Sequence, residues 1–236
     1  MAEVTLKDLL EAGAHFGHQA RRWNPAMAKY IYGKRGGIHI FDLVQTKKGL
    51  DEAVEFVKKL TGEGKVILFV GTKRQAAATV KAAAERVGMP YLSVRWIGGL
   101  LTNWAQMEKR IRKMFDMKDK REKGEYKKYT KREQILIDRE IAKLEKFFGG
   151  VAKMGKLPSA LFVVDSHREE VAVREAVRMG IPVVALVDSN ADPNLTDYVI
   201  PGNDDAVKSV ELVVGAVADA IAESKSVRVE EQEEKK

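Results

Sequence analysis

Two histidines near the start of the chain and four aspartates near its end are the side chains best suited to bind a metal ion. His15 and His18, in "AHFGHQARRWNP", are three residues apart, a spacing that would place both on one face of a helix. The acids close apolar runs or open a helix in "VDSNADPN" and "GNDD": Asp188, Asp192, Asp204 and Asp205. Loops after parallel strands gather at one edge of a sheet, so these groups are expected to meet there. One imidazole with several carboxylates suits Mg²⁺ or Zn²⁺, and the expected ligands are His18, Asp188, Asp204 and Asp205.

A purely structural role explains the same residues. Asp204 or Asp205 would cap the last helix, Asp188 and Asp192 would build turns, and the histidines would pack in the interior. Both explanations stay open on the sequence alone.

Catalytic machinery does not accompany these residues in the sequence. The chain has no cysteine, which excludes disulfides and thiolate metal sites and is typical of a reducing, cytosolic compartment. The segment "VGTKRQ" follows a strand pattern and opens a helix, where phosphates often bind, but it lacks the glycines of nucleotide-binding loops. Lys73 and Arg74 at this helix start either hold an anion or are solvated cations. We therefore expect no enzymatic activity and no required cofactor.

A basic and aromatic segment near the N-terminus indicates RNA binding. In "QARRWNPAMAKYIYGKRGGIHIFDL", cations interleave with aromatic residues: Arg21, Arg22, Lys29, Lys34 and Arg35 with Trp23, Tyr30 and Tyr32. Lys and Arg neutralise phosphates, while aromatic rings and guanidinium planes stack on unpaired bases. The stretch "VRWIGGLLTNW" repeats this chemistry, and there we expect Arg95 to be an exposed contact and Trp96 and Trp104 to be structural.

Short apolar runs alternate with helical patterns in much of the chain. Residues 65–71, 159–165, 181–188 and 197–202 are nearly continuous apolar segments, typical of strands covered on both faces. Helical patterns occupy residues 47–60, 73–87, 169–179 and 205–223. This order predicts an α/β fold with a mostly parallel sheet and helices on both faces.

The alternation is interrupted between Asn103 and Gly150, where two charged helical stretches flank "KGEYKKYT". Apolar residues recur at helical spacing on both arms: Trp104, Met107, Ile111, Met114 and Phe115 on the first, and Ile137, Ile141, Leu144 and Phe148 on the second. The pattern predicts a protruding antiparallel helical hairpin, which is basic because residues 108–146 hold 15 Lys or Arg against 9 Asp or Glu. We therefore expect an α/β sheet domain of residues 1–102 and 151–225, a hairpin insertion of residues 103–150, and a disordered tail of residues 226–236.

Six motifs occur in a defined order along the chain. They are "HFGHQARRWNP", "GIHIFDL", "ILFVGTKRQA", "RWIGGLLTNW", "PSALFVVD" and "GIPVVALVDSNADPNLTDYVIPGNDD". From about Thr5 to Ala222, the chain resembles small-subunit ribosomal protein two of the bacterial type. The resemblance implies a flavodoxin-like sheet with a protruding helical hairpin. It also implies a cytoplasmic, non-catalytic constituent of the small ribosomal subunit that binds ribosomal RNA between head and body and supports translation.

The resemblance further implies partners and RNA contacts. The partners are small-subunit ribosomal RNA and neighbouring small-subunit proteins, including the large messenger-RNA-capturing protein that family members help recruit; no membrane and no DNA are expected. The RNA-binding role is carried onto the basic positions and one tryptophan: Arg21, Arg22, Trp23, Lys29, Lys34, Arg35, Lys73, Arg74, Arg95, Lys109, Arg110, Arg112, Lys113, Lys127, Lys128, Lys131 and Arg132.

A different class of function would use the crevice above the sheet. A metal-dependent hydrolase of phosphate esters would bind its metal through His18, Asp188, Asp204 and Asp205. A nucleotide-binding module would use the same crevice. The hydrolase accounts for the acids but not for the hairpin, and the nucleotide module is weakened by the missing glycines.

Overall fold

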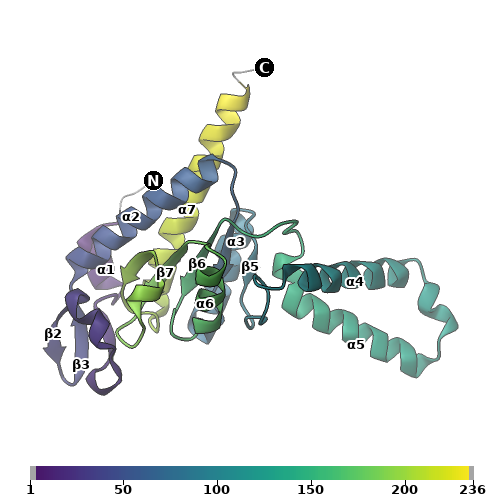
Figure 1. Ribbon diagram of the computed structural model, residues 1–236, viewed down its shortest axis with the longest axis horizontal. Coiled ribbons are helices and arrows are strands. Elements are labelled where there is room, and N and C mark those ends of the chain that lie inside the picture. The colour runs from purple at the N-terminus through teal and green to yellow at the C-terminus, as the bar shows by residue number, and fades with distance from the viewer. Residues whose placement is uncertain (1–3, 234–236) are drawn as a thin grey trace.

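A five-stranded parallel sheet forms the centre of the protein. The computed structural model describes the backbone of residues 4–233 and the side chains of residues 4–227 (Figure 1). The strands are β4 (Ile67–Val70), β5 (Tyr91–Leu92), β6 (Ala160–Val164), β7 (Val183–Val187) and β8 (Tyr198–Pro201), in the spatial order β5-β4-β6-β7-β8. All neighbouring pairs are parallel. This is the flavodoxin-like strand order, which confirms the predicted fold class.

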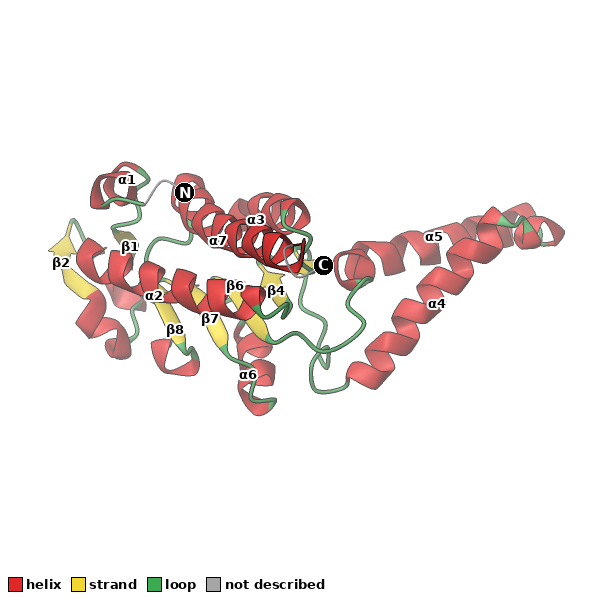
Figure 2. Cartoon of the chain, turned by 90° about the horizontal axis from the view of Figure 1, so that it is seen from above, coloured by secondary structure: helices red, strands yellow, loops and turns green. Residues whose placement is uncertain are grey.

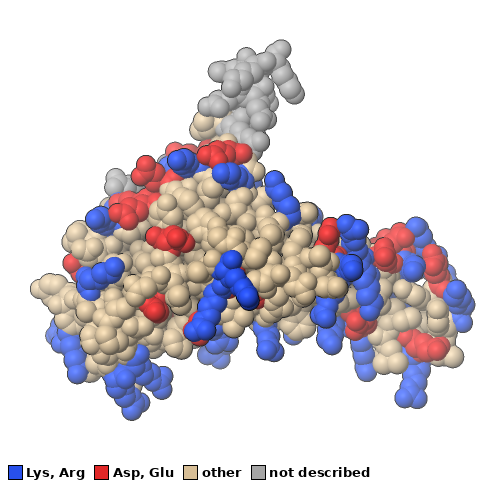
Figure 3. Space-filling model, viewed as in Figure 1, with Lys and Arg blue, Asp and Glu red and all other residues tan. Residues whose placement is uncertain are grey.

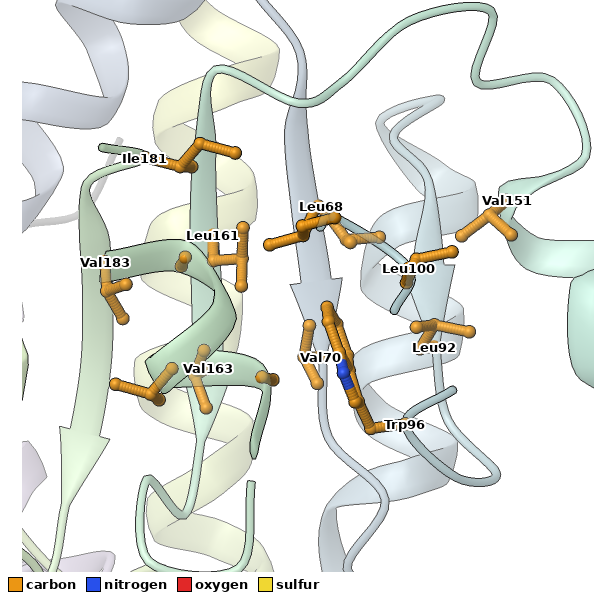
Figure 4. Packing of buried hydrophobic residues seen from close by; sticks show 14 of the residues in the cluster. Leu68, Val70, Leu92, Trp96, Leu100, Val151, Leu161, Val163, Ile181 and Val183 are labelled. Atoms are coloured by element: carbon orange, nitrogen blue, oxygen red, sulfur yellow. The ribbon is translucent and has the colours of Figure 1, made fainter. Parts of the chain in front are cut away.

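Helices cover both faces of this sheet. α2 (Leu43–Gly62), α3 (Arg74–Arg86) and α7 (Val207–Glu233) lie on one face, and α6 (Glu170–Arg178) lies on the other (Figure 2). Successive residues of a strand point into two different hydrophobic cores. Leu68 and Leu161 belong to the core between the sheet and α6 (Figure 4), and Phe69 and Phe162 belong to the core on the opposite face. Because both faces are buried, the strands are apolar throughout, as the continuous apolar runs predicted.

The basic and aromatic N-terminal segment folds into a small antiparallel sheet that was not predicted. After α1 (Leu6–Glu11), strands β1 (Phe16–Gln19), β2 (Ile31–Arg35) and β3 (Ile38–Phe41) pair in the order β1-β3-β2. Short 3-10 helices, Ala20–Arg22 and Pro25–Tyr30, connect β1 to β2. Gly36 and Gly37 join β2 to β3 with φ values of 58° and 80°. A Gly-Gly pair supplies the positive φ that two-residue hairpins require, and this was the signal that the sequence analysis overlooked.

Between β5 and β6 the chain forms two helices that pack side by side and project from the sheet (Figures 1 and 2). They are α4 (Trp104–Glu122) and α5 (Lys131–Phe148), joined by the 3-10 helix Glu125–Lys128. The buried residues between them and the sheet are Met107, Ile111, Met114, Leu144 and Phe148. Phe115 was expected in the same stripe, but 48% of it is exposed. It lies at the margin of the stripe that Met107, Ile111 and Met114 define.

Ion pairs also join the two arms of the hairpin. Lys113 Nζ lies 3.6 Å from Glu140 Oε1, Lys118 Nζ lies 2.5 Å from Glu145 Oε1, and Arg121 Nη2 lies 2.7 Å from Asp138 Oδ2. These side chains are largely exposed, so each pair contributes only about 0–1 kcal/mol. Part of the positive charge on the hairpin shaft is nevertheless compensated within the hairpin itself.

The last helix is longer than predicted. The predicted helical pattern ended at residue 223, whereas α7 continues through Glu233. The predicted disorder of residues 226–236 stays a prediction, and residues 234–236 lie outside the described part of the chain. A helix whose first turns are fixed by packing extends at little cost, and Glu, Gln, Lys and Arg in the last turns are good helix formers. Within the described residues, no helix combines the length and apolarity needed to cross a membrane.

Candidate functional site

An acidic cluster lies at the carboxyl edge of the parallel sheet. It consists of His18, Lys73, Asp165, Asp188, Asp204 and Asp205. Lys73 follows β4, Asp165 follows β6, Asp188 follows β7, and the last two acids follow β8, while His18 comes from β1. Loops that follow parallel strands emerge at the same edge, which is why residues so far apart in sequence meet here. The structure thus brings together all four residues that were predicted as metal ligands.

Three of these residues are close enough to share one metal ion. One ligand atom each from His18, Asp188 and Asp204 lie within 4.8 Å of one another. His18 Nδ1 lies 3.0 Å from Asp188 Oδ1, and His18 Nε2 lies 3.5 Å from Asp205 Oδ2. Among the described residues, Asp204 Oδ2 is buried without a hydrogen-bond partner. A buried carboxylate oxygen without a partner is costly, and a bound cation would supply one.

The electrostatics of the cluster favour an added positive charge. Burial raises the pKa of Asp204 well above its usual range, and the negative charges of Asp188 and Asp165 raise it further. The hydrogen bond to Asp188 raises the pKa of His18, even though burial acts in the opposite direction. Both shifts show that carboxylates crowd this edge of the sheet, so that a proton or a metal ion is stabilised there.

Lys73 lies inside the acidic cluster instead of on the outer surface. Its ammonium nitrogen contacts three carboxylates: Asp204 Oδ1 at 2.6 Å, Asp205 Oδ1 at 2.5 Å and Asp165 Oδ2 at 3.4 Å. Burial alone would lower the pKa of Lys73, but the charges of Asp204 and Asp165 outweigh burial and raise it. Only 11% of the side chain is exposed. The RNA contact of Lys73 stays a prediction, although carboxylates of the same chain already pair with its ammonium group.

Strand β1 delivers His18 to the edge of the sheet. The backbone N–H of His18 donates to Asp188 Oδ1 at 3.1 Å and to Ser189 Oγ at 2.9 Å. Gly17 permits this close approach, since a Cβ there would lie 3.0 Å from Ser189 Oγ and 3.2 Å from the ring of Phe41. The N–H of Ser189 also donates to Asp188 Oδ1 at 2.6 Å, which fixes the carboxylate. Backbone contacts therefore preset the distance between imidazole and carboxylate.

The other histidine of the predicted pair does not join the cluster. His15 immediately precedes strand β1, so the helical spacing assumed for His15 and His18 is wrong, and residues three apart in extended chain point to different faces. Burial lowers the pKa of His15, and in the described part of the chain its Nδ1 has no partner. Its ring packs against Phe16 with centroids 4.0 Å apart. His15 thus matches the packing role that was the structural alternative.

The alternative explanation, in which the aspartates build turns or cap helices, holds for Asp192. It does not hold for Asp204 and Asp205, which follow β8. Asp192 Oδ1 accepts from the N–H of Asn194 at 3.0 Å and opens the 3-10 helix Pro193–Leu195. Before α7, however, Asn203 Oδ1 accepts from the N–H groups of Asp205 and Ala206, at 2.9 and 3.1 Å. Asn203 therefore does the capping that was expected of Asp204 or Asp205, and those two carboxylates are free to face Lys73 and His18.

Two acids of this edge were missed by the sequence analysis. Asp165 has a positive φ of 68°, which is uncommon for a residue other than glycine. Glu169 is 3% exposed, and its Oε1 accepts from the N–H and the hydroxyl of Thr72. Burial raises the pKa of Glu169. The signal for Asp165 was available, because "VVD" ends strand β6 in the same way that "LVD" ends β7.

The stretch around Arg95 has a structural half and an exposed half. Trp96 is 8% exposed, packs beside Val70, Leu92 and Leu100 (Figure 4), and donates from Nε1 to Glu175 Oε1 at 3.0 Å. Glu175 also accepts from the backbone N–H groups of residues 99, 101 and 102 and from the hydroxyl of residue 102. The expectation that Trp96 is structural is confirmed, and Arg95 is exposed.

The remaining residues predicted to bind RNA lie on the surface. All are exposed: Arg21, Arg22, Trp23, Lys29, Lys34, Arg35, Arg74, Arg95, Lys109, Arg110, Arg112, Lys113, Lys127, Lys128, Lys131 and Arg132. Lys and Arg side chains gather over the β2–β3 hairpin and along α4 and α5 (Figure 3). Trp23 stacks on His39 with ring centroids 4.9 Å apart and remains 37% exposed. The exposed cations therefore form two surfaces, one on the N-terminal sheet and one on the hairpin.

These features define a class of protein: a flavodoxin-like α/β protein with an acidic cluster at the carboxyl edge of the sheet and basic surfaces on the outside. Such a fold alone serves many functions. A family model described as "Ribosomal protein S2" matches residues 9–224. The chain is also 52% identical over 225 residues to the small ribosomal subunit protein uS2 of Roseiflexus sp. (strain RS-1), covering 95% of this chain and 86% of that protein. The chain therefore belongs to the ribosomal protein S2 family.

Family membership decides between the classes of function considered above. Proteins of this family are structural components of the ribosome and not enzymes. The prediction that the chain is not an enzyme is thereby confirmed. Neither the phosphate-ester hydrolase nor the nucleotide-binding module is adopted, and the acidic cluster has to be explained as part of a structural protein.

Proposed function

We propose that this protein is a cytoplasmic constituent of the small ribosomal subunit that binds ribosomal RNA between head and body and thereby supports translation. The observation that carries the proposal is the exposed basic surface of the N-terminal sheet. Arg21, Arg22, Lys34 and Arg35 are exposed there, and no carboxylate of the described residues forms an ion pair with them. Tyr32, 82% exposed, and Trp23 lie among them. Unpaired cations neutralise phosphates, and the aromatic rings can stack on unpaired bases.

The hairpin supplies a second RNA surface at the opposite end of the molecule (Figure 1). On its shaft, Arg112 and Lys113 are partly neutralised by Glu108 and Glu140. At its tip, four exposed cations form no ion pair with any carboxylate in the described part of the chain: Lys127, Lys128, Lys131 and Arg132. Two basic surfaces, on the N-terminal sheet and on the hairpin at opposite ends of the molecule, suit a protein that holds two parts of a ribosomal subunit together.

Binding to small-subunit ribosomal RNA at several salt concentrations tests this proposal. Changing Arg21, Arg22, Lys34 and Arg35 to Gln should flatten the log–log salt dependence by about 3 to 4 if all four contact phosphates. The matched control changes four exposed lysines on α2, α3 and α7 to Gln: Lys48, Lys59, Lys81 and Lys208. Equal flattening by both variants would mean that net charge, and not the N-terminal sheet, determines RNA binding. Wild-type protein that neither binds this RNA nor sediments with small subunits would refute the function itself.

We also propose that the protein helps recruit the large small-subunit protein that captures messenger RNA. The support in this chain is an apolar surface beside the basic N-terminal sheet: Leu6, Leu10 and Phe16 are 46%, 54% and 47% exposed. Exposed apolar residues that form one patch mark protein contacts, and Leu6 and Leu10 lie one turn apart on α1. Changing Leu10 and Phe16 to Ser should lower the amount of that protein retained on small subunits while RNA binding stays unchanged. Unchanged retention would remove this surface from the proposal.

For the acidic cluster we propose one bound divalent cation, Mg²⁺ or Zn²⁺, held by His18, Asp188 and Asp204 with Asp205 adjacent. The unpartnered buried oxygen of Asp204 and the 4.8 Å spacing of the ligand atoms support it. A nitrogen and carboxylate donor set suits Zn²⁺, and an all-oxygen subset suits Mg²⁺. The cation would tie β1 to the loops after β7 and β8, so its role would be to stabilise the fold.

Thermal unfolding with and without metal tests the cation. Zn²⁺ or Mg²⁺ added to chelator-treated wild-type protein should raise Tm, since a ligand at 100 times its Kd stabilises a protein by about 2.7 kcal/mol. Asp204→Asn should abolish this response. Asp192→Asn, a change in a turn-building aspartate outside the cluster, should retain it. Equal Tm values for the metal-free and metal-loaded wild-type protein would leave Lys73 as the cation that neutralises the cluster.

A further inference from the structure

A groove of about 660 Å³ lies where the hairpin meets the sheet, away from the acidic cluster and the N-terminal sheet. One wall is the segment Arg95–Gly98, which follows β5, and the other walls are α4 and α5. The volume lies within the roughly 300–1,000 Å³ typical of ligand pockets. The groove is therefore large enough for a ligand larger than a single ion.

The lining of this groove combines an apolar floor with cations. Trp96, Leu144 and Phe148 are the buried apolar residues of the lining, and Phe147 is half-buried. The charged residues are four cations and one acid: Arg95, Arg110, Lys113, Lys143 and Glu140. Lys113 Nζ lies 3.6 Å from Glu140 Oε1, so the charges of these two side chains partly compensate each other. Among the described residues, no carboxylate forms an ion pair with Arg95, Arg110 or Lys143.

The wall formed by Arg95–Gly98 is fixed before any ligand arrives. Glu175 accepts from Trp96 Nε1 at 3.0 Å and from the N–H of Gly99 at 2.7 Å, which ties the segment to α6. Hydrogen bonds to an ionised carboxylate are stronger than those between neutral groups. A wall of this kind loses little conformational entropy when a ligand binds, and that favours affinity.

We propose that this groove holds one unpaired nucleotide of ribosomal RNA. The nucleobase would lie against Phe147 and the adjoining apolar floor of the groove. The phosphates on either side of it would contact Arg95, Arg110 and Lys143. Bases that leave the stack are commonly bound on aromatic or guanidinium planes, with cations on the backbone. The proposal rests on the proposed RNA-binding function and adds a specific site, because the exposed cations alone would bind any phosphate backbone.

Charge complementarity selects an RNA chain over other occupants. Three uncompensated cations surround the apolar floor of the groove. They match a nucleobase with phosphates on either side, whereas an apolar peptide would leave these cations without partners. A free mononucleotide carries too few phosphates to reach all three cations, and the groove has neither a glycine-rich loop nor a helix N-terminus in its lining to cradle its phosphates. We therefore expect binding to depend on a phosphate chain.

Two pairs of matched variants test the groove, with wild-type small-subunit ribosomal RNA as the probe at several salt concentrations. Arg110→Gln with Lys143→Gln should reduce the log–log salt slope by about 1.4, from two lost phosphate contacts of about 0.7 each in single-stranded RNA. The control, Lys146→Gln with Lys208→Gln, removes the same charge from exposed lysines outside the groove and should leave the slope unchanged. Phe147→Leu should weaken binding by roughly tenfold because the stacking ring is lost. Its control is Phe115→Leu, which alters an exposed ring outside the groove and should have no effect.

The outcomes separate the groove from the function on which it rests. Suppose that wild-type protein binds the RNA and that the variant Arg110→Gln with Lys143→Gln binds it with the same affinity and salt slope. This result would overturn the nucleotide site in the groove and leave the proposed RNA-binding function intact. Wild-type protein that does not bind the RNA would overturn both. Groove variants that bind RNA normally but no longer sediment with small subunits would overturn the nucleotide in favour of a protein occupant. Ultraviolet cross-linking gives an independent readout: RNA cross-links in residues 94–99 or 143–148 support the site, and cross-links confined to the N-terminal sheet overturn it.

Discussion

The carboxylate of Glu175 is expected to be the main attachment of the segment after β5, and replacing it with Gln tests this. Its two oxygens accept five hydrogen bonds: from Trp96 Nε1, from the N–H groups of Gly99, Leu101 and Thr102, and from the hydroxyl of Thr102. Glutamine is nearly the same size but has only one acceptor oxygen. The change therefore removes acceptors without creating a cavity.

The magnitude follows from which of these bonds survive. The amide oxygen can keep the bonds from Trp96 and Gly99, which now both go to Oε1. The amide nitrogen then faces the N–H of Leu101, a residue 1% exposed, and the N–H and hydroxyl of Thr102. Thr102 is exposed and can bind water, but a buried N–H that loses its partner costs about 1–3 kcal/mol. With the weaker bonds to a neutral acceptor added, Glu175→Gln should lower the free energy of unfolding by about 2–3 kcal/mol.

The effect should also depend on pH. Partial burial alone would raise the pKa of Glu175, but the hydrogen bonds from Trp96, Gly99, Thr102 and Leu101 outweigh it and lower the pKa below its ordinary value of 4.5. A lowered folded-state pKa means that the stabilisation is fully present above pH 4.5 and is lost as the pH falls through the folded-state value. The difference in unfolding free energy between wild-type protein and Glu175→Gln should therefore be constant near neutral pH and shrink in acid.

Urea unfolding of both proteins across this pH range measures the difference directly. Glu170→Gln is the matched control, since it makes the same change on the same helix. Glu170 is exposed, and its one ion pair among the described residues is with Arg174 four residues on, at 2.6 Å, so the control should cost no more than about 0.5 kcal/mol. Similar losses in the two variants, or a Glu175→Gln loss that persists unchanged in acid, would refute the argument that the carboxylate attaches this segment.

Two further predictions concern a helix contact and the hairpin tip. Gly49→Ala should destabilise the protein by about 1–3 kcal/mol, because a Cβ there would overlap the carbonyl oxygen of Val199 in β8. The control is Gly62→Ala in the same helix. Its Cβ would meet nothing within 4 Å, so the Tm should stay unchanged or rise slightly. Reversing the charge of the four tip cations should flatten the salt dependence of RNA binding by about 1 per lost contact without changing Tm. The residues are Lys127, Lys128, Lys131 and Arg132. A folded tip variant with wild-type affinity and slope would exclude the tip as an RNA contact.

The elements that were predictable from the sequence are those whose burial dictates their composition. β4, β6 and β7 are buried on both faces, so every position is apolar and the strands stand out. The N-terminal strands are only partly buried, so no continuous apolar run marks them, and β5 has only two residues. The extension of α7 beyond the predicted helix has a different cause. Composition indicates how well a segment folds alone, whereas α7 starts from turns that are already packed against α2 and α3.

Site residues were predictable where their position after a strand places them at a known edge of the sheet. They were not predictable where their role depends on partners that are distant in sequence. Asp188 and Asp204 were found because acids after parallel strands share an edge. The burial of Lys73 among acids was not predicted, because the Asp204 carboxylate that accepts its hydrogen bond is 131 residues away in sequence. Glu175 was missed because one acid on an amphipathic helix looks like a solvated residue, and its partners precede it by 73 to 79 residues. Sequence reveals residue types at a site, but which charges neutralise one another depends on the assembled fold.

Such internal neutralisation reconciles an acidic cluster with an RNA-binding surface. Four carboxylates are at least 90% buried, those of Asp165, Glu169, Asp188 and Asp204, whereas no Lys or Arg with a described side chain is buried to that extent. Anions held beneath the surface, beside Lys73 and His18, repel an approaching phosphate less than exposed anions would, because nearby cations cancel their field at short range. The potential close to the exposed basic surfaces is therefore set mainly by their own cations. Acids at the sheet edge and cations on the outside are thus compatible parts of one charge distribution. The acids hold β1 to the sheet, and the exposed cations are available to the proposed RNA.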